Sequence, residues 1–143
     1  MVFSSFPGST FLSHLGSRLF STSRPASHII KLTRLRVVDN SALGKQAMMD
    51  GKPPRCIHVY NKTGIGTVGD KILVTIKGQK KKALIVGVRQ RQKCFVPRFD
   101  SNNIVLIDDN GNPLGTRVHV PVPSMLRGKK EFSKVLALCT SFV

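Results

Sequence analysis

Two apolar stretches flank a basic connection in residues 72–88, which have the sequence ILVTIKGQKKKALIVGV. Both stretches, 72–76 and 83–88, are rich in the branched aliphatic residues that fit a pleated sheet. We therefore expect strands over 71–77 and 82–88, joined through residues 78–81 into a hairpin. Its tip would hold the lysine run of residues 80–82 on a rigid support.

The whole chain is strongly basic. It has 23 Lys and Arg residues against 7 Asp and Glu, a formal net charge of +16 over 143 residues. Such an excess repels itself in a compact chain and is tolerated most easily when a polyanion neutralises it. The hydrophobic content of 41% is sufficient for a core, and the length fits one domain. The composition therefore favours a folded nucleic-acid-binding domain over a wholly disordered basic chain.

Residues 1–30 differ in composition from the rest. They contain no Asp or Glu, many Ser residues, and Arg18 and Arg24 as their only strong bases. This composition is typical of a mitochondrial transit peptide, and Arg18-Leu19-Phe20 before Ser21 resembles a matrix-peptidase site. A disordered basic tail is the alternative. We expect residues 1–30 to be a transit peptide, either cleaved or disordered, and residues 31–143 to form a single RNA-binding domain in the mitochondrial matrix.

From residue 31 onward, short apolar runs alternate with turn residues at intervals typical of a small β-barrel. A closed barrel hides its strand edges and holds basic loop residues in place before a ligand arrives. A short helix is expected at 123–127, between prolines and Gly128. The segment 94–99 would be an edge strand because Pro97 cannot donate a ladder hydrogen bond. The predicted strands are 32–38, 55–60, 71–77, 82–88, 94–99, 103–107, 115–120 and, in preference to a helix, 133–138.

The cysteines give no sign of a metal site. Cys56, Cys94 and Cys139 are far apart, no CxxC pair occurs, and three is an odd number. Buried or half-buried free thiols in a reducing compartment are the favoured interpretation. Cys56 and His58 could share one strand face, but two ligands do not make a zinc site. We predict no metal.

No residue set indicates catalysis. Asp108 and Asp109 are adjacent in a predicted turn, which is a poor arrangement for an acid–base pair. The glycines of residues 64–69 follow the GxGxxG pattern, but no βαβ unit surrounds them, and a glycine-rich loop is favoured. No apolar run approaches the roughly 20 residues that span a bilayer. We predict no enzyme, no cofactor and no membrane span.

The densest basic block follows the first predicted strand of the hairpin. Nothing acidic lies between residues 71 and 99, so the block lacks local partners. Contact with RNA phosphates is favoured over a solvated hairpin tip kept polar for solubility. Two arginines on one side of the predicted strand 32–38 are further candidates. The RNA-binding candidates from this pattern are Arg34, Arg36, Lys77, Lys80, Lys81, Lys82, Arg89, Arg91 and Lys93.

Six short motifs, in unbroken order over about residues 32–143, resemble the large-subunit ribosomal protein fourteen family. They are RVVDNS at 36–41, RCIHV at 55–59, VGDKI at 68–72, PRFDSNN at 97–103, PLGTRV at 113–118 and FSKVLAL at 132–138. Each motif alone is not specific to the family, whereas six motifs in the family's order are strong evidence for the resemblance. With residues 1–30, the chain resembles the mitochondrial member of that family.

The resemblance implies a small closed five-stranded β-barrel with an added hairpin and one or two short C-terminal helices. It implies binding to large-subunit mitochondrial rRNA, neighbouring large-subunit proteins, the small subunit at the subunit interface, and a ribosome-silencing factor. It further implies that Arg98 and Arg117 contact RNA. It also implies a structural turn at Asp39, Asn40 and Ser41.

The chain also departs from the family pattern. Residues 78–82 are shorter than the bacterial segment, and residues 44–54 look like a variable insertion to which no role can be transferred. Two other classes of function remain open from the residues alone: a dissociable translation or RNA-processing factor, and an RNA-modifying enzyme, for which no catalytic set is visible.

Overall fold

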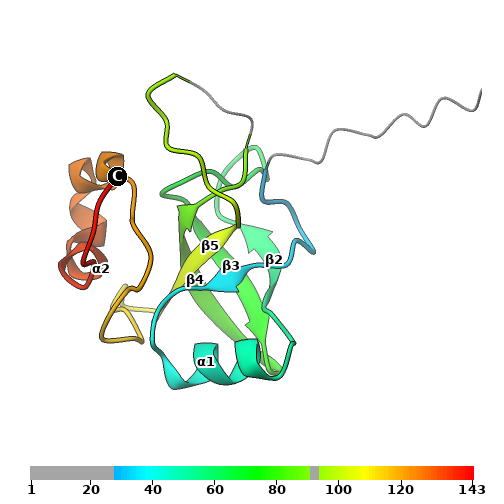
Figure 1. Ribbon diagram of the computed structural model, residues 1–143. Helices are drawn as coiled ribbons and strands as arrows, with labels where there is room; N and C mark the ends of the chain where they lie inside the picture. The colour runs from blue at the N-terminus through cyan, green and yellow to red at the C-terminus, as the bar shows by residue number, and fades with distance from the viewer. Residues whose placement is uncertain (1–27, 91–93) are drawn as a thin grey trace, which may run out of the picture.

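The computed structural model describes residues 28–90 and 94–143 (Figure 1). The five strands form one sheet in the order β1-β5-β4-β3-β2; neighbours are antiparallel except β1 and β5, which are parallel. The fold is therefore mostly β with short helices, as predicted. The elements in chain order are β1 (Arg36–Val37), α1 (Ala42–Met49), β2 (Arg55–Val59), β3 (Lys71–Ile76), β4 (Gln79–Gly87), β5 (Asn103–Ile107), the 3-10 helices η1 (Ser124–Gly128) and η2 (Lys130–Phe132), and α2 (Ser133–Ala137).

The β3–β4 hairpin has a two-residue turn. Ile76 pairs with Gln79, so that only Lys77 and Gly78 connect the strands, with φ angles of 47° and 79°. Positive φ at both central residues is the type I′ pattern that matches the twist of a hairpin. The predicted connection through residues 78–81 was therefore wrong: the lysine run lies inside β4 and not at a tip.

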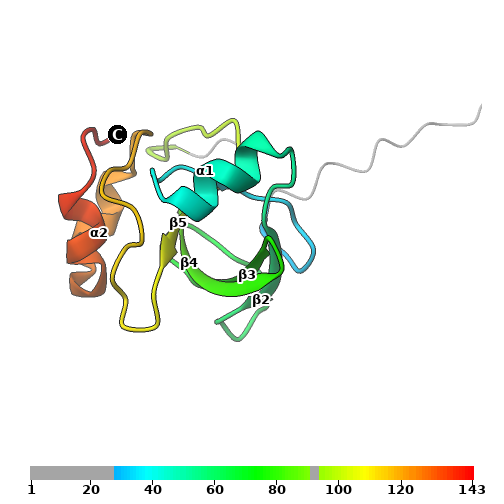
Figure 2. The same ribbon diagram turned by 90° about the horizontal axis from the view of Figure 1, so that it is seen from below.

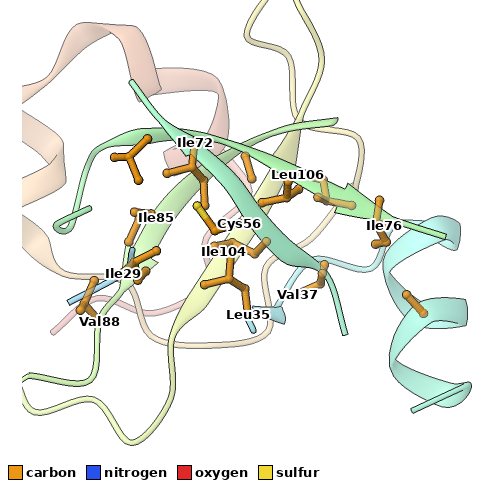
Figure 3. Close-up of a cluster of buried hydrophobic side chains, with 14 residues drawn as sticks. Ile29, Leu35, Val37, Cys56, Ile72, Ile76, Ile85, Val88, Ile104 and Leu106 are labelled. Atoms are coloured by element: carbon orange, nitrogen blue, oxygen red, sulfur yellow. The ribbon is translucent and has the colours of Figure 1, made fainter. Parts of the chain in front are cut away.

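An interior cluster of apolar side chains fills the concave side of the sheet (Figure 3). Alternate residues of β3, β4 and β5 point into it, as the period of a strand requires. In β4 these are Ala83 and Ile85, and in β5 they are Ile104 and Leu106; all four are fully buried. The remaining members are Ile29, Leu35, Val37, Ala47, Cys56, Val59, Ile72, Val74, Ile76 and Val88.

An outer cluster lies on the opposite face of β4 and β5. Leu84 and Val86 from β4 and Val105 and Ile107 from β5 are buried there beneath the chain that follows β5. Figure 2 shows this C-terminal segment beside the β4–β5 side of the sheet. It contributes Val118, Val122, Leu126, Phe132 and Val135. Both faces of these strands are covered, which explains why residues 83–88 and 103–107 are apolar without alternation.

The strand ladders do not close the sheet into the predicted barrel, because β1 and β2 stand at opposite ends of the strand order. The residues just before β1 do contact β2. Leu32 N donates to Cys56 O at 2.8 Å, Cys56 N to Thr33 O at 2.9 Å, and Leu35 N to Pro54 O at 3.0 Å. The chain around β1 thus approaches β2 at residues 32–35 and pairs with β5 at residues 36–37.

A bulge in β2 changes which side chains share a face. The register with β3 shifts between Cys56 and His58. Cys56 and Val59 consequently both point inward and are buried, whereas His58 and Tyr60 are exposed, their rings 5.4 Å apart in an edge-on contact. The prediction that Cys56 and His58 could share one face was wrong, because an extra residue reverses the alternation.

Three other predicted strands differ from the structure. Cys94 and Phe95 lie in a turn, and Phe95 has a φ of 59°, which no strand permits. Residues 115–120 make only isolated bridges, for example Asp39 with Val118. Within the predicted strand 133–138, residues Ser133–Ala137 form the helix α2, because Val135 packs into the outer cluster one turn after Phe132. The short helix expected at 123–127 is present as η1.

Helix α1 occupies the segment to which sequence analysis assigned no element. Ser41 is its N-cap, and the Ser41 hydroxyl accepts a hydrogen bond from Gly44 N at 3.2 Å. Ala47 reaches the interior cluster. Figure 1 shows α1 at one end of the sheet and the loop between β4 and β5 at the other.

Candidate nucleic-acid interface

The predicted basic block is divided between the two ends of the sheet. Lys77 and Lys80 lie at the hairpin end of β4, whereas Arg89 lies beyond the opposite end of the strand. Nine residues at about 3.3 Å each separate Lys80 from Arg89, roughly 30 Å of extended chain. Arg91 and Lys93 lie outside the described residues. These candidates are close in sequence, but they do not form one surface.

Two of the candidate lysines have acidic partners. Lys77 Nζ lies 2.7 Å from Asp50 Oδ2 at the end of α1, and Lys82 Nζ lies 2.9 Å from Asp109 Oδ1. The hydrogen bond to Asp109 raises the pKa of Lys82, and the same contact lowers the pKa of Asp109. Asp109 follows β5, and the pairing of Lys82 with Ile107 in the β4–β5 register brings it beside Lys82.

The neighbouring lysines of β4 differ from one another. Lys80 is exposed, and Lys81 is half-buried. Lys81 is paired with the buried Val74 and therefore lies toward the concave side of the sheet, whereas Lys80 is paired with Thr75 on the outer side. Among the described residues, neither lysine forms an ion pair.

Arg34 and Arg36 are both exposed, on the outer side of the chain at β1. Arg34 forms an isolated bridge with Arg55, the first residue of β2, which is also exposed. Arg55 was not among the RNA-binding residues predicted from sequence. The strand 55–60 was predicted, but no local pattern shows that its first residue faces Arg34, because that pairing joins segments about twenty residues apart.

The loop between β4 and β5 carries Arg89 and Arg98, both exposed. Arg89 N donates to Asn102 Oδ1 at 2.9 Å, which ties the start of the loop to its end. Phe95, in the turn at residues 94–95, is fully exposed. This exposed aromatic ring was not predicted from sequence, because residues 94–99 were expected to form a strand.

The segment 39–41 is held by a network of side-chain hydrogen bonds. Asp39 is buried; its Oδ1 accepts from the Ser41 hydroxyl at 2.7 Å, and its Oδ2 accepts from Leu106 N of β5 at 3.1 Å. Burial raises the pKa of Asp39, and these hydrogen bonds oppose the rise in part. Asp39 therefore joins the start of α1 to the middle of β5.

Asn40 links the same turn to residues 116 and 117. Its Oδ1 accepts from Thr116 N at 2.7 Å and from Arg117 N at 3.2 Å, and its Nδ2 donates to the Thr116 hydroxyl at 2.8 Å. Gly115 fits closely here, since an added Cβ would lie 2.9 Å from Asp39 Cβ. Arg117 is exposed beside this contact. Two motifs that are about 76 residues apart in sequence are thus brought together.

Comparison with known proteins leads to the same family as these motifs. Residues 28–143 match the family described as Ribosomal protein L14p/L23e. The chain belongs to this family. A relative from Danio rerio, named large ribosomal subunit protein uL14m, is 57% identical over 127 residues, which are 88% of this chain and 89% of the relative. The family predicted from the six motifs is therefore confirmed.

The L14p/L23e family is one of ribosomal proteins and not of enzymes, which confirms the prediction that the chain is not an enzyme. Within residues 28–90 and 94–143, no group of three or more His, Cys, Asp and Glu residues is arranged to hold a metal ion. The three cysteines are free thiols: Cys56 is buried and Cys139 is half-buried, as predicted, whereas Cys94 is exposed, so that the prediction was wrong for this residue. In the same part of the chain, no helix has both the length and the apolar character needed to cross a membrane.

One shallow groove of about 530 Å³ lies beside the outer face. Its lining includes Tyr60, Lys71, Lys82, Asp109 and Glu131. Lys71 Nζ lies 2.7 Å from Glu131 Oε2, and Lys82 is paired with Asp109, so that these four charges neutralise one another. The groove is thus distinct in character from the uncompensated arginines and Lys80.

Proposed function

We propose that this chain is a structural component of the large subunit of the mitochondrial ribosome and binds large-subunit rRNA. The observation that carries the proposal is membership in the L14p/L23e family, with 57% identity to a large-subunit ribosomal protein over 88% of the chain. The net charge of +16 supports an RNA partner, since assembly with phosphates removes the self-repulsion of so basic a protein.

The residues proposed to contact RNA are cations supported by the sheet or by tethered loops. A rigid support reduces the ordering entropy that is lost on binding. Lys77 and Lys82 are weaker candidates, because Asp50 and Asp109 already neutralise them. The exposed candidates without an ion pair among the described residues are Arg34, Arg36, Lys80, Arg89, Arg98 and Arg117.

We also propose that the sheet works as a closed barrel. The support is the set of hydrogen bonds from residues 32–35 to residues 54–56, together with an interior cluster to which every strand contributes. In such a barrel, the segment 32–38 serves both open edges, one half pairing with β2 and the other with β5. Closure would leave no sheet edge free for pairing with other chains.

Residues 1–30 are proposed to direct the chain to the mitochondrial matrix, on the basis of their composition. Ile29 belongs to the interior cluster, and its backbone pairs with Gly66. A final cut that preserves this packing would fall before Ile29, close to the boundary expected from sequence. Mass spectrometry of the protein isolated from mitochondria would locate the mature N-terminus.

The remaining proposals concern partners. The family resemblance implies contacts with neighbouring large-subunit proteins and with the small subunit at the interface, where bridges form. It also implies a docking face for a ribosome-silencing factor that blocks subunit joining. Family membership is the support for each.

Gradient sedimentation of a mitochondrial lysate at raised salt tests the proposal, with this protein measured across the fractions. We expect comigration with the large subunit at about one copy per particle, because contacts buried within folded RNA resist salt. A pool at the top of the gradient, or binding only at low salt, would favour the alternative of a dissociable factor.

A further inference from the structure

A row of side chains crosses the outer face of the sheet near the hairpin end. Arg34 is opposite Arg55, Arg55 is opposite Thr75, and Thr75 is opposite Lys80. Directly opposed residues of neighbouring strands point to the same side. That side is the outer one, because the sequence neighbours Leu35, Cys56, Val74 and Lys81 lie on the concave side, the first three of them in the interior cluster.

The row brings like charges together without compensation. Arg34 and Arg55 are both exposed and directly opposed, an arrangement that destabilises an isolated sheet. Among the described residues, no acid forms an ion pair with Arg34, Arg55 or Lys80. The acids near this end are engaged elsewhere, Asp50 with Lys77 and Asp109 with Lys82.

We propose that Arg34, Arg55 and Lys80 form a phosphate-binding row that takes a segment of RNA backbone across the outer face of β2, β3 and β4. This inference rests on the proposed function and names the site where RNA lies. Strands are spaced by about 4.8 Å, so the three steps from Arg34 to Lys80 span roughly 14 Å. That length accommodates more than one phosphate.

The chemistry of the row matches a nucleic-acid backbone. Guanidinium groups bind phosphate oxygens through two parallel hydrogen bonds, and a lysine supplies a point charge. Thr75, half-buried between Arg55 and Lys80, adds a hydroxyl of the kind that contacts phosphates and sugars. Bound phosphates would also remove the repulsion between Arg34 and Arg55, so binding and relief of strain act in the same direction.

The first test is a double-mutant cycle on the full chain without RNA. Arg34→Gln, Arg55→Gln and the double variant are unfolded in urea at low and raised salt. We expect each single variant to raise the urea midpoint and the double variant to gain less than the sum, with the coupling weaker at raised salt because salt screens exposed charges. Lys45→Gln, on the exposed side of α1, is the control for loss of one charge. If the urea midpoint falls in both arginine variants and the two changes show no coupling, Arg34 and Arg55 do not repel each other, and the row is overturned.

The second test measures binding of the full chain to a labelled 20-base-pair RNA duplex over a salt series. The triple variant Arg34→Gln/Arg55→Gln/Lys80→Gln should bind at least tenfold more weakly at about 0.1 M salt. The slope of log affinity against log salt should fall by about two to three, the contribution of three phosphate contacts. The matched control Lys45→Gln/Lys52→Gln/Lys62→Gln removes the same charge from other exposed positions and should lose less affinity.

Four outcomes separate the hypotheses. Equal losses in the two triple variants would show that only net charge matters and would overturn the row. Competition by polyglutamate at lower concentration than by RNA would replace RNA with an acidic protein segment. Sedimentation of the unaltered chain with the large subunit, while the row variant binds RNA and comigrates equally well, would reject the row and leave the proposed function in place; failure of the unaltered chain to comigrate would reject the proposed function itself.

Discussion

The outer face of the sheet has two halves that differ in what covers them. Over β4 and β5, the C-terminal segment buries Leu84, Val86 and Val105. Over β2, β3 and the first half of β4, no described segment covers the face to the same degree, and Arg55 and Lys80 are exposed. Both halves share one sheet and one interior cluster.

This difference shows that β4 serves two purposes along its length. Its first residues, 79–82, are polar and exposed or half-buried, whereas residues 83–87 are buried on both faces. A strand covered on both sides must be apolar throughout, but a strand covered on one side can carry cations on the other. One half of the face therefore contributes to stability and the other is available for a polyanion.

The largest expected effect breaks the covered half. Leu84 is fully buried in the outer cluster, and its replacement by Ala should lower the free energy of unfolding by about 2–5 kcal/mol. Leu73 of β3 lies on the same outer face, opposite Lys82, and is only half-buried. Leu73→Ala should cost less than half as much in the same urea titration. Equal costs would show that the two halves are equally covered.

A second prediction concerns the link between the covered half and the turn at residues 39–41. A Cβ at position 115 would lie 2.9 Å from Asp39 Cβ and 3.0 Å from Asn40 Oδ1. Gly115→Ala should therefore destabilise the protein by about 1–3 kcal/mol, measured by thermal or urea unfolding. Gly111→Ala also replaces a loop glycine but meets no atom within 4 Å; its cost should come from its φ of 78° alone.

A third prediction is the pH dependence of Asp39→Asn. Burial raises the pKa of Asp39 above 3.8 in the folded protein. The free energy of unfolding therefore decreases as the pH rises from the unfolded pKa to the folded pKa, whereas below the unfolded pKa the neutral carboxyl carries no such cost. The stability of the Asn variant relative to the unaltered protein should thus increase between about pH 3 and about pH 7. A difference that is constant with pH, or that decreases, would contradict this assignment. Urea midpoints at each pH provide the measurement.

The smallest expected effect sharpens the uncovered half. Lys80 and Lys82 are neighbours on the same face of β4, but only Lys82 has an acidic partner, Asp109. Lys80→Gln should reduce the salt slope of RNA binding by about one, whereas Lys82→Gln should reduce it by less, because Asp109 already neutralises that charge. Neither change should shift the urea midpoint appreciably, since exposed ion pairs contribute little. A larger binding loss for Lys82→Gln would show that the ion pair opens on binding.

The segments predicted well from sequence are those in which local pattern and environment agree. Residues 55–59 and 71–76 are rich in residues that favour strands, and residues 103–107 form an apolar run between turn residues; all three are strands. The prediction of a strand at 133–138 was wrong because six residues with several apolar side chains fit either period, and packing against the outer cluster decided for α2. Helix α1 was missed because its interior contact is confined to few residues, Ala47 among them.

By itself, the sequence determined the excess of positive charge, the mostly β character and the family, since these depend on composition, on period and on the order of short motifs. Only the tertiary structure decided which charges remain uncompensated. Lys77 and Lys82 meet Asp50 and Asp109 across distant segments, whereas Arg34 meets another arginine, Arg55. The physical reason is that strand register joins residues far apart in the chain, and a charge acts through its neighbours in space.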